Sequence, residues 1–187
     1  MRKSKQTTQG RVYLDCVENS ASERKELSEA EQDAVRERIW SLVGRVAQES
    51  ASVEMCLRSL MAKLLNSKYG DIIAAGQSAT DLIENCIALI QANEEIGEKV
   101  RESALGLLRS VKPLFAQRNN IVHAPWFPSF YEESRSEALS LVSKRRSLPR
   151  PTLVSYAEVE KLCSDLNATL PKIWSVEGAV QRSNGNQ

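Results

Sequence analysis

Apolar residues recur every three or four positions between residues 35 and 64, and this spacing predicts one long amphipathic helix. Ser28 stands three residues before Glu31, a spacing at which each side chain satisfies a free backbone N–H at a helix start. A helix unbroken to Asn66 would contain about 38 residues and span roughly 57 Å. The small residues between Gln48 and Ser52 leave two alternatives: the helix breaks there, or its overhang packs on a second copy of the chain. The apolar positions are Val35, Ile39, Leu42, Val46, Val53, Leu57, Leu60 and Leu64.

Two further helices are predicted in the middle of the chain. Gly70 ends the first region, and a second helix begins at Ser78. A third begins near Gly97, and its apolar pattern continues to Val122. Pro113 lies inside that pattern and should kink the helix or divide it in two, because proline has no N–H and clashes with the preceding turn. Pro125 follows shortly after and sets the stop.

The chain between residues 126 and 154 reads differently. An aromatic run is followed by apolar residues at alternating positions, Leu139 and Leu141, which favours a β-hairpin. A short helix over residues 136–146 is the competing interpretation, because so brief an apolar run fits both. Ser155 and Glu158 then form a second capping box, which opens a last helix that Pro171 should kink near its end.

These elements predict an all-α protein, a bundle of four to five helices with a small β-hairpin before the last one. We expect a flexible N-terminal arm over residues 1–26, a helical domain over 27–178 and a polar tail over 179–187. The chain of 187 residues suits this single domain, and 8 Gly and 6 Pro are few for a fold of many strands. The net charge of +1 excludes a strongly basic binder and leaves room for a local basic patch.

The cysteines form no metal-binding spacing, so we expect no zinc site and no metal. Cys56, Cys86 and Cys163 are interpreted as small buried side chains. No stretch approaches the roughly 18 apolar residues of a membrane span, and the basic N-terminus has no apolar segment behind it. The sequence therefore predicts a cytoplasmic protein without a membrane partner.

The chemistry of the chain centres on His123, its single histidine. Arg118, a permanent planar cation, and Asn119, an amide that donates and accepts, precede it in an otherwise apolar helix. Histidine is the side chain that changes charge between pH 5 and 8. Five residues correspond to roughly 140° on a helix, so Arg118 and His123 would not share one face but would edge the same groove.

This segment resembles the R-x4-H motif of the HEPN superfamily, in its common form Arg-Asn-x-x-x-His, at Arg118, Asn119 and His123. The setting is similar too: an all-α bundle, the motif late in a long apolar helix, then a closing helix. The resemblance covers about residues 28–178.

Many HEPN proteins are metal-independent endoribonucleases whose dimers join two motifs in one composite site, in toxin–antitoxin, phage-defence and RNA-processing systems. The resemblance implies that His123 handles protons, Arg118 stabilises phosphate charge and Asn119 orients either the histidine or the phosphate. It implies a homodimer, RNA as substrate, a 2′,3′-cyclic phosphate product, no cofactor, and an antitoxin or regulatory protein as a further partner. Lys144, Arg145 and Arg146 form a dense basic cluster and are the candidate RNA-binding residues.

One departure and several plainer interpretations stand beside this reading. One toxin branch has a modified tyrosine two residues after the histidine, where this chain has Pro125. Many HEPN domains lack nuclease activity, so a non-catalytic dimerisation module is the alternative function, and a helical interaction protein outside the family is a third.

Each candidate residue also has a structural interpretation. His123 would cap a helix end, Arg118 would form a surface salt bridge and Asn119 would loosen the helix. The basic cluster would be a solvated loop. Glu54 and Glu84 are interpreted as solvated. The aromatic residues Trp126, Phe127 and Phe130 are interpreted as core packing.

Overall fold

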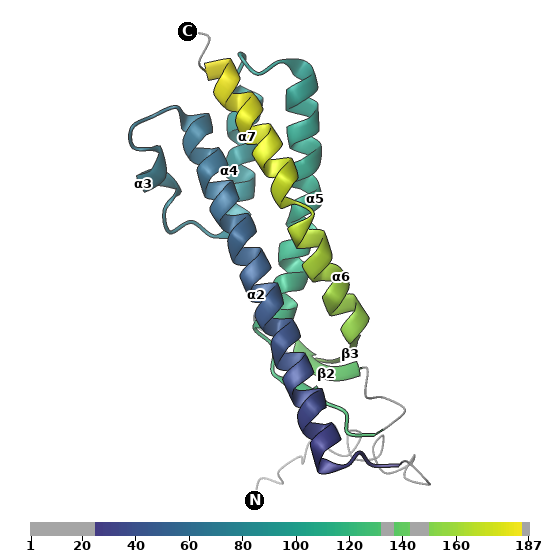
Figure 1. Cartoon of the computed structure of the whole chain (residues 1–187). Helices are drawn as coiled ribbons and strands as arrows, with labels where there is room; N and C mark the ends of the chain where they lie inside the picture. The colour runs from purple at the N-terminus through teal and green to yellow at the C-terminus, as the bar shows by residue number, and fades with distance from the viewer. Residues whose placement is uncertain (1–24, 132–136, 143–149, 185–187) are drawn as a thin grey trace, which may run out of the picture.

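The computed structural model describes residues 25–131, 137–142 and 150–184. Long helices stand side by side, and a small sheet lies at one end of them (Figure 1). The predicted arm over residues 1–26 lies outside the described residues except for its last two. The elements in chain order are α2 (Glu29–Leu65), α3 (Gly70–Ala74), α4 (Ala79–Ala92), α5 (Glu98–Val122), β1 (Trp126–Pro128), β2 (Glu137–Val142), β3 (Arg150–Ser155), α6 (Tyr156–Asn167) and α7 (Leu170–Asn184).

Helix α2 is a single helix of 37 residues, so the alternative of a break near Gln48–Ser52 is wrong. It begins as predicted, because Glu31 Oε2 accepts hydrogen bonds from the backbone N–H of Ser28 at 3.0 Å and from its hydroxyl at 2.6 Å. All eight predicted apolar positions of this helix are buried. Ser50 stands between the buried residues Val46 and Val53, and its side chain is also fully buried.

Helices α4 and α5 begin at the predicted residues. Ser78 Oγ accepts a hydrogen bond from the backbone N–H of Asp81 at 3.2 Å, and Gly97 caps α5. Pro113 does not divide α5, which continues to Val122 because buried Val111 and Phe115 on either side of the proline hold it in the bundle.

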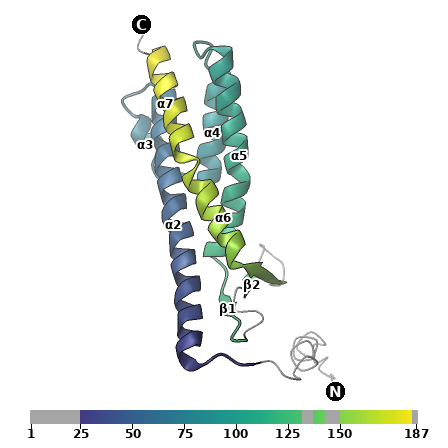
Figure 2. The same ribbon diagram turned by 45° about the vertical axis from the view of Figure 1, so that its right-hand side comes forward.

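The last predicted helix is two helices, α6 and α7, and the chain turns between them at residues 168 and 169. Pro171 occupies the second position of α7, where a missing N–H costs nothing because the first turn has no intrahelical acceptor. Both helices run parallel to α2 (Figure 2). Residue numbers rise in the same direction along α2 and along α6 and α7. The side-chain hydrogen bonds that show this join Arg38 to Glu160, Glu49 to Asn167, Ser59 to Glu177 and Lys63 to Gln181.

The β region contains a three-stranded antiparallel sheet in the order β1-β2-β3, so the predicted hairpin is too small and the competing helix over residues 136–146 is wrong. β2 is the central strand: Leu139 pairs with Phe127 of β1 and with Leu153 of β3. The chain just before α2 is tied to the segment after β1, since Leu27 donates its backbone N–H to Phe130 O at 2.8 Å.

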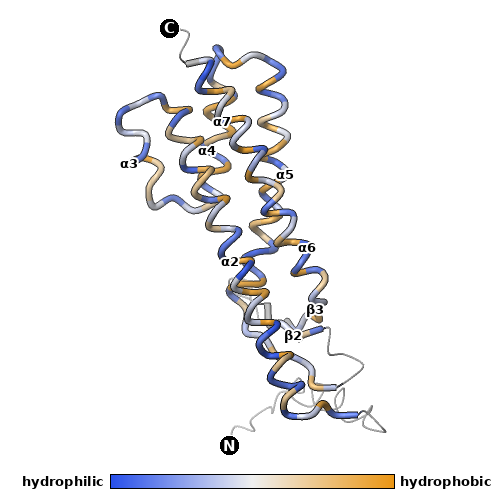
Figure 3. The backbone as a smooth tube through the Cα atoms, viewed as in Figure 1, coloured by the Kyte–Doolittle hydropathy of each residue, from blue (hydrophilic) through white to orange (hydrophobic). Residues whose placement is uncertain are grey.

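One hydrophobic core joins all the long helices, and apolar and polar residues alternate around each of them (Figure 3). Cys56, Cys86 and Cys163 are buried in it as predicted, and burial raises the pKa of the Cys86 thiol to about 12. None of the described helices is both long and apolar enough to cross a membrane.

Candidate functional site

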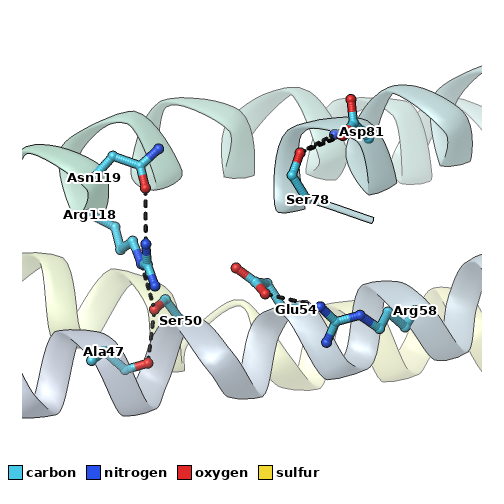
Figure 4. A network of polar contacts seen from close by, with 8 residues as sticks. All are labelled: Ala47, Ser50, Glu54, Arg58, Ser78, Asp81, Arg118 and Asn119. Atoms are coloured by element: carbon cyan, nitrogen blue, oxygen red, sulfur yellow. Dashed lines mark hydrogen bonds and ion pairs between the residues drawn. The ribbon is translucent and has the colours of Figure 1, made fainter. Parts of the chain in front are cut away.

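The motif residues gather where the last turns of α5 pass α2. The guanidinium of Arg118 points across to α2, and its Nε donates a hydrogen bond to Ser50 Oγ at 3.1 Å (Figure 4). Ser50 in turn donates its hydroxyl proton to Ala47 O, 2.9 Å away in the preceding turn. The hydroxyl is therefore oriented by its own helix, and its lone pair is directed at the arginine.

The other end of the guanidinium binds the two remaining motif residues. Arg118 Nη1 lies 3.1 Å from Asn119 Oδ1 and 3.1 Å from His123 Nε2. Arginine has donors only, so this geometry requires Nε2 to be the acceptor and Nδ1 to carry the proton of a neutral imidazole. The site thus presents a fixed cation next to an unprotonated imidazole nitrogen.

The structure brings Arg118 and His123 closer than a regular helix would allow. His123 lies beyond the last residue of α5 as its C-cap, with φ −103° and ψ 0°, and donates its backbone N–H to Asn119 O at 3.3 Å. Leaving the helical path lets the imidazole turn back toward Arg118. The expectation that the two residues merely edge one groove is therefore too weak, because they are in direct contact.

Ser50 is the residue of this site that the sequence analysis missed. The signal was present in the small residues between Gln48 and Ser52, which had left a helix break as one of two alternatives. A small side chain is needed there because the guanidinium reaches a fully buried position on α2.

Polar side chains continue along α2 from Ser50 to Glu54 and Arg58, opposite the start of α4 (Figure 4). Glu54 stands one turn after Ser50 and forms an ion pair with Arg58, with 3.3 Å between Oε2 and Nη2. Its side chain is only 23% exposed, so the interpretation of Glu54 as fully solvated is wrong. Glu84 is 57% exposed and pairs with Lys112 on α5, as a solvated position would.

The sheet fixes the end of α5 directly behind the motif. Trp126 is buried and donates its indole N–H to Ile121 O at 2.8 Å, which satisfies a carbonyl of the last helical turn. Phe127, by contrast, is 50% exposed, so its assignment to the core is wrong. Phe130 is half-buried, and the guanidinium of Arg36 lies 4.7 Å from its ring centroid.

The candidate RNA-binding residues Lys144, Arg145 and Arg146 lie outside the described residues. Within the described residues, no group of three or more His, Cys, Asp or Glu side chains is placed to hold a metal ion.

The fold and site define a helical bundle with an Arg–Asn–His cluster at the C-terminal end of α5. Comparison with known proteins gives no match to a family model, to a curated protein or to a solved structure.

Proposed function

We propose that this protein is a metal-independent endoribonuclease of HEPN type that acts as a homodimer with a composite Arg/His site. The observation that supports it is the contact of Arg118 Nη1 with His123 Nε2 at 3.1 Å. A cation and an unprotonated imidazole nitrogen, side by side and exposed, are the two groups that cleavage of RNA without a metal requires.

In the proposed reaction Arg118 Nη1 moves from His123 Nε2 to the phosphate, and the freed lone pair of Nε2 takes the proton of an RNA 2′-hydroxyl. The freed O2′ forms a bond to the adjacent phosphorus, and the bond from phosphorus to O5′ breaks. The departing O5′ takes up a proton, and the products are a 2′,3′-cyclic phosphate and a 5′-hydroxyl. The Arg118 guanidinium, already held at both ends, stabilises the negative charge that develops on the phosphate oxygens.

Asn119 has a positioning role in this proposal. Its Oδ1 accepts a hydrogen bond from Arg118 Nη1. This bond holds the guanidinium beside His123 and prevents its rotation into solvent. Lys144, Arg145 and Arg146 are proposed to bind the RNA backbone, a contact that weakens with rising salt. A toxin or phage-defence role, with an antitoxin or regulatory protein as partner, belongs to the same proposal.

The experiment that tests the proposal is incubation of the purified protein with RNA in excess EDTA. We expect cleavage to continue, to leave cyclic phosphate ends and to be lost in His123→Ala. Asn120→Ala is the matched control, since Asn120 is an exposed neighbour in the same helical turn and lies outside the Arg118 contacts. Activity that disappears with the chelator, or that survives His123→Ala, contradicts the mechanism.

A non-catalytic dimerisation module is the second candidate. It is favoured by the capping position of His123, because a histidine at a helix C-terminus also serves stability alone. It predicts no cleavage of any RNA and a dimer that persists in the double variant Arg118→Ala/His123→Ala. RNA cleavage that this double variant abolishes would exclude it.

A further inference from the structure

One face of α2 is apolar but is covered by nothing in the described part of the chain. Trp40 is 58% exposed and Met55 is 63% exposed, although both belong to the same helix. Residues 44 and 51, Gly44 and Ala51, lie between them on the same side at helical spacing and are exposed as well. We call this surface the open face of α2, and it consists of Glu37, Trp40, Gly44, Ala51, Met55 and Arg58.

Further along α2 the same side is covered by the chain itself. A Cβ on Gly70 would lie only 2.7 Å from Ala62 O, so α3 packs directly against α2 at Ala62. Below α3 the outer side of α2 has no helix beside it in either view (Figures 1 and 2). The open face is therefore a part of this side that α3 leaves uncovered.

Gly44 has no role within one chain that explains its presence. It lies in the interior of α2, where glycine costs roughly 1 kcal/mol relative to alanine. A Cβ at this position would meet nothing within 4 Å, so no neighbour in the chain requires the space. The missing side chain leaves room for the close approach of another molecule.

The residues of the open face are arranged symmetrically by size about its centre, with two small residues inside two large apolar ones, and the charges at its two ends are opposite. An antiparallel copy of α2, centred between Ala47 and Gln48, places Trp40 opposite Met55 and Gly44 opposite Ala51. The same register places the carboxylate of Glu37 opposite the guanidinium of Arg58, which also pairs with Glu54 of its own chain. A surface that complements itself in shape and in charge about one point is what a two-fold dimer interface requires.

We propose that the open face of α2 is the interface at which a second copy of this chain docks, antiparallel, about a two-fold axis near Ala47 and Gln48. This inference rests on the homodimer of the proposed function and adds the surface and its register. Ser50 lies roughly 4 Å along the helix from that axis. Because Ser50 holds Arg118, the two Arg118 side chains lie at nearly the same level along the paired α2 helices, on sides of these helices that do not belong to the open face.

The first test is the mass of the full chain in solution, measured by light scattering or sedimentation over a range of concentrations. We expect the wild-type protein to be a dimer and Gly44→Glu to be a monomer, with its dissociation constant raised at least tenfold. The fold survives this change because the position is open and glutamate favours a helix more than glycine does. Gly106→Glu is the matched control: Gly106 is also exposed inside a long helix with nothing within 4 Å, and the dimer should persist.

The second test uses the charges. Glu37→Arg should weaken the dimer, since it opposes Arg58 of the partner subunit, and the double variant Glu37→Arg/Arg58→Glu should restore it. A monomeric wild-type protein, or a dimer that Gly44→Glu leaves unchanged, overturns the proposed interface.

These outcomes separate the interface from the chemistry. If the wild-type protein is a dimer that cleaves no RNA and Gly44→Glu is a monomer, the interface is supported and only the nuclease is contradicted. Persistence of both dimer and cleavage in Gly44→Glu contradicts only the interface.

Discussion

The hydroxyl of Ser50 on α2 accepts a hydrogen bond from Nε of Arg118 on α5, and these two residues are 68 positions apart. Ser50 is fully buried, whereas the guanidinium it holds extends to an exposed histidine. The contact thus links the packed interior of the bundle to the proposed site at its surface. It also accounts for an otherwise puzzling polar residue in the apolar side of the longest helix.

Removal of the Ser50 hydroxyl should impair catalysis more than stability. Ser50→Ala deletes the acceptor of Arg118 Nε, so we expect kcat for RNA cleavage to fall about tenfold, equivalent to about 1.4 kcal/mol, with little change in KM. Ser52→Ala is the control, because Ser52 also bonds a carbonyl of the preceding turn and lies outside the Arg118 contacts. In an Arg118→Lys background, which has no Nε, Ser50→Ala should have almost no further effect, and a full tenfold loss there would show that Ser50 acts by another route.

The tautomer of His123 offers a test that needs no substrate. Because Arg118 Nη1 donates to Nε2, the proton of the neutral imidazole should reside on Nδ1. The chain has a single histidine, so nitrogen–proton correlation spectra contain one imidazole system to assign. We expect Nδ1–H in the wild-type protein and a shift toward Nε2–H in Arg118→Ala, while an Nε2–H tautomer in the wild-type protein would contradict the contact.

The pairing of α2 with α7 should depend on pH. Burial alone would raise the pKa of the Glu177 carboxyl, but hydrogen bonds from Lys63 and Ser59 outweigh it and lower this pKa below its ordinary value of 4.5. A carboxyl with a lowered pKa in the folded state stabilises the fold above that ordinary value and loses the contribution as the pH falls through the folded value. Glu177→Gln should therefore reduce the free energy of unfolding by about 1 kcal/mol at pH 7, and the difference should shrink toward pH 3.

Denaturant unfolding of both proteins at the two pH values measures this difference. Glu160→Gln is the control, since its pair with Arg38 joins α2 to α6 in the same way but both side chains are about half exposed. A constant deficit for Glu177→Gln across the pH range would show that packing, and not charge, accounts for it.

The contact of α3 with α2 should be intolerant of a single methyl group. In Gly70→Ala the new Cβ would lie 2.7 Å from Ala62 O, a backbone atom that cannot move aside. We expect a loss of roughly 1–3 kcal/mol in unfolding free energy, the usual cost of overpacking. Gly106→Ala, which meets nothing within 4 Å, should instead be neutral or stabilising by up to about 1 kcal/mol.

Local signals in the sequence predicted most element boundaries correctly. The capping boxes at Ser28 and Ser155, and the cap at Ser78, act within four residues, so they need no knowledge of the fold. The two prolines show the limit of such signals. Pro113 remains within α5 because the helix is packed on both sides of it, whereas Pro171 marks the start of a new helix.

The parts that could not be predicted depend on contacts between distant segments. Helix α3 has five residues and no periodicity to detect, and only its packing on Ala62 gives it a place. The motif residues were predicted from the sequence, but their mutual geometry depends on Ser50 and on the position of His123 beyond the helix end.

The parallel alignment of α2 with α6 and α7 has a consequence for how the chain folds. The side-chain contacts that join them link residues 114 to 122 positions apart, from Lys63–Glu177 (177 − 63 = 114) to Arg38–Glu160 (160 − 38 = 122). Contacts this distant in sequence form late, because the loop between them must close first, whereas α4 and α5 are neighbours along the chain. During synthesis α4 and α5 can therefore pack on α2 first, and the side of α2 that α6 and α7 cover stays exposed until the C-terminal helices have emerged.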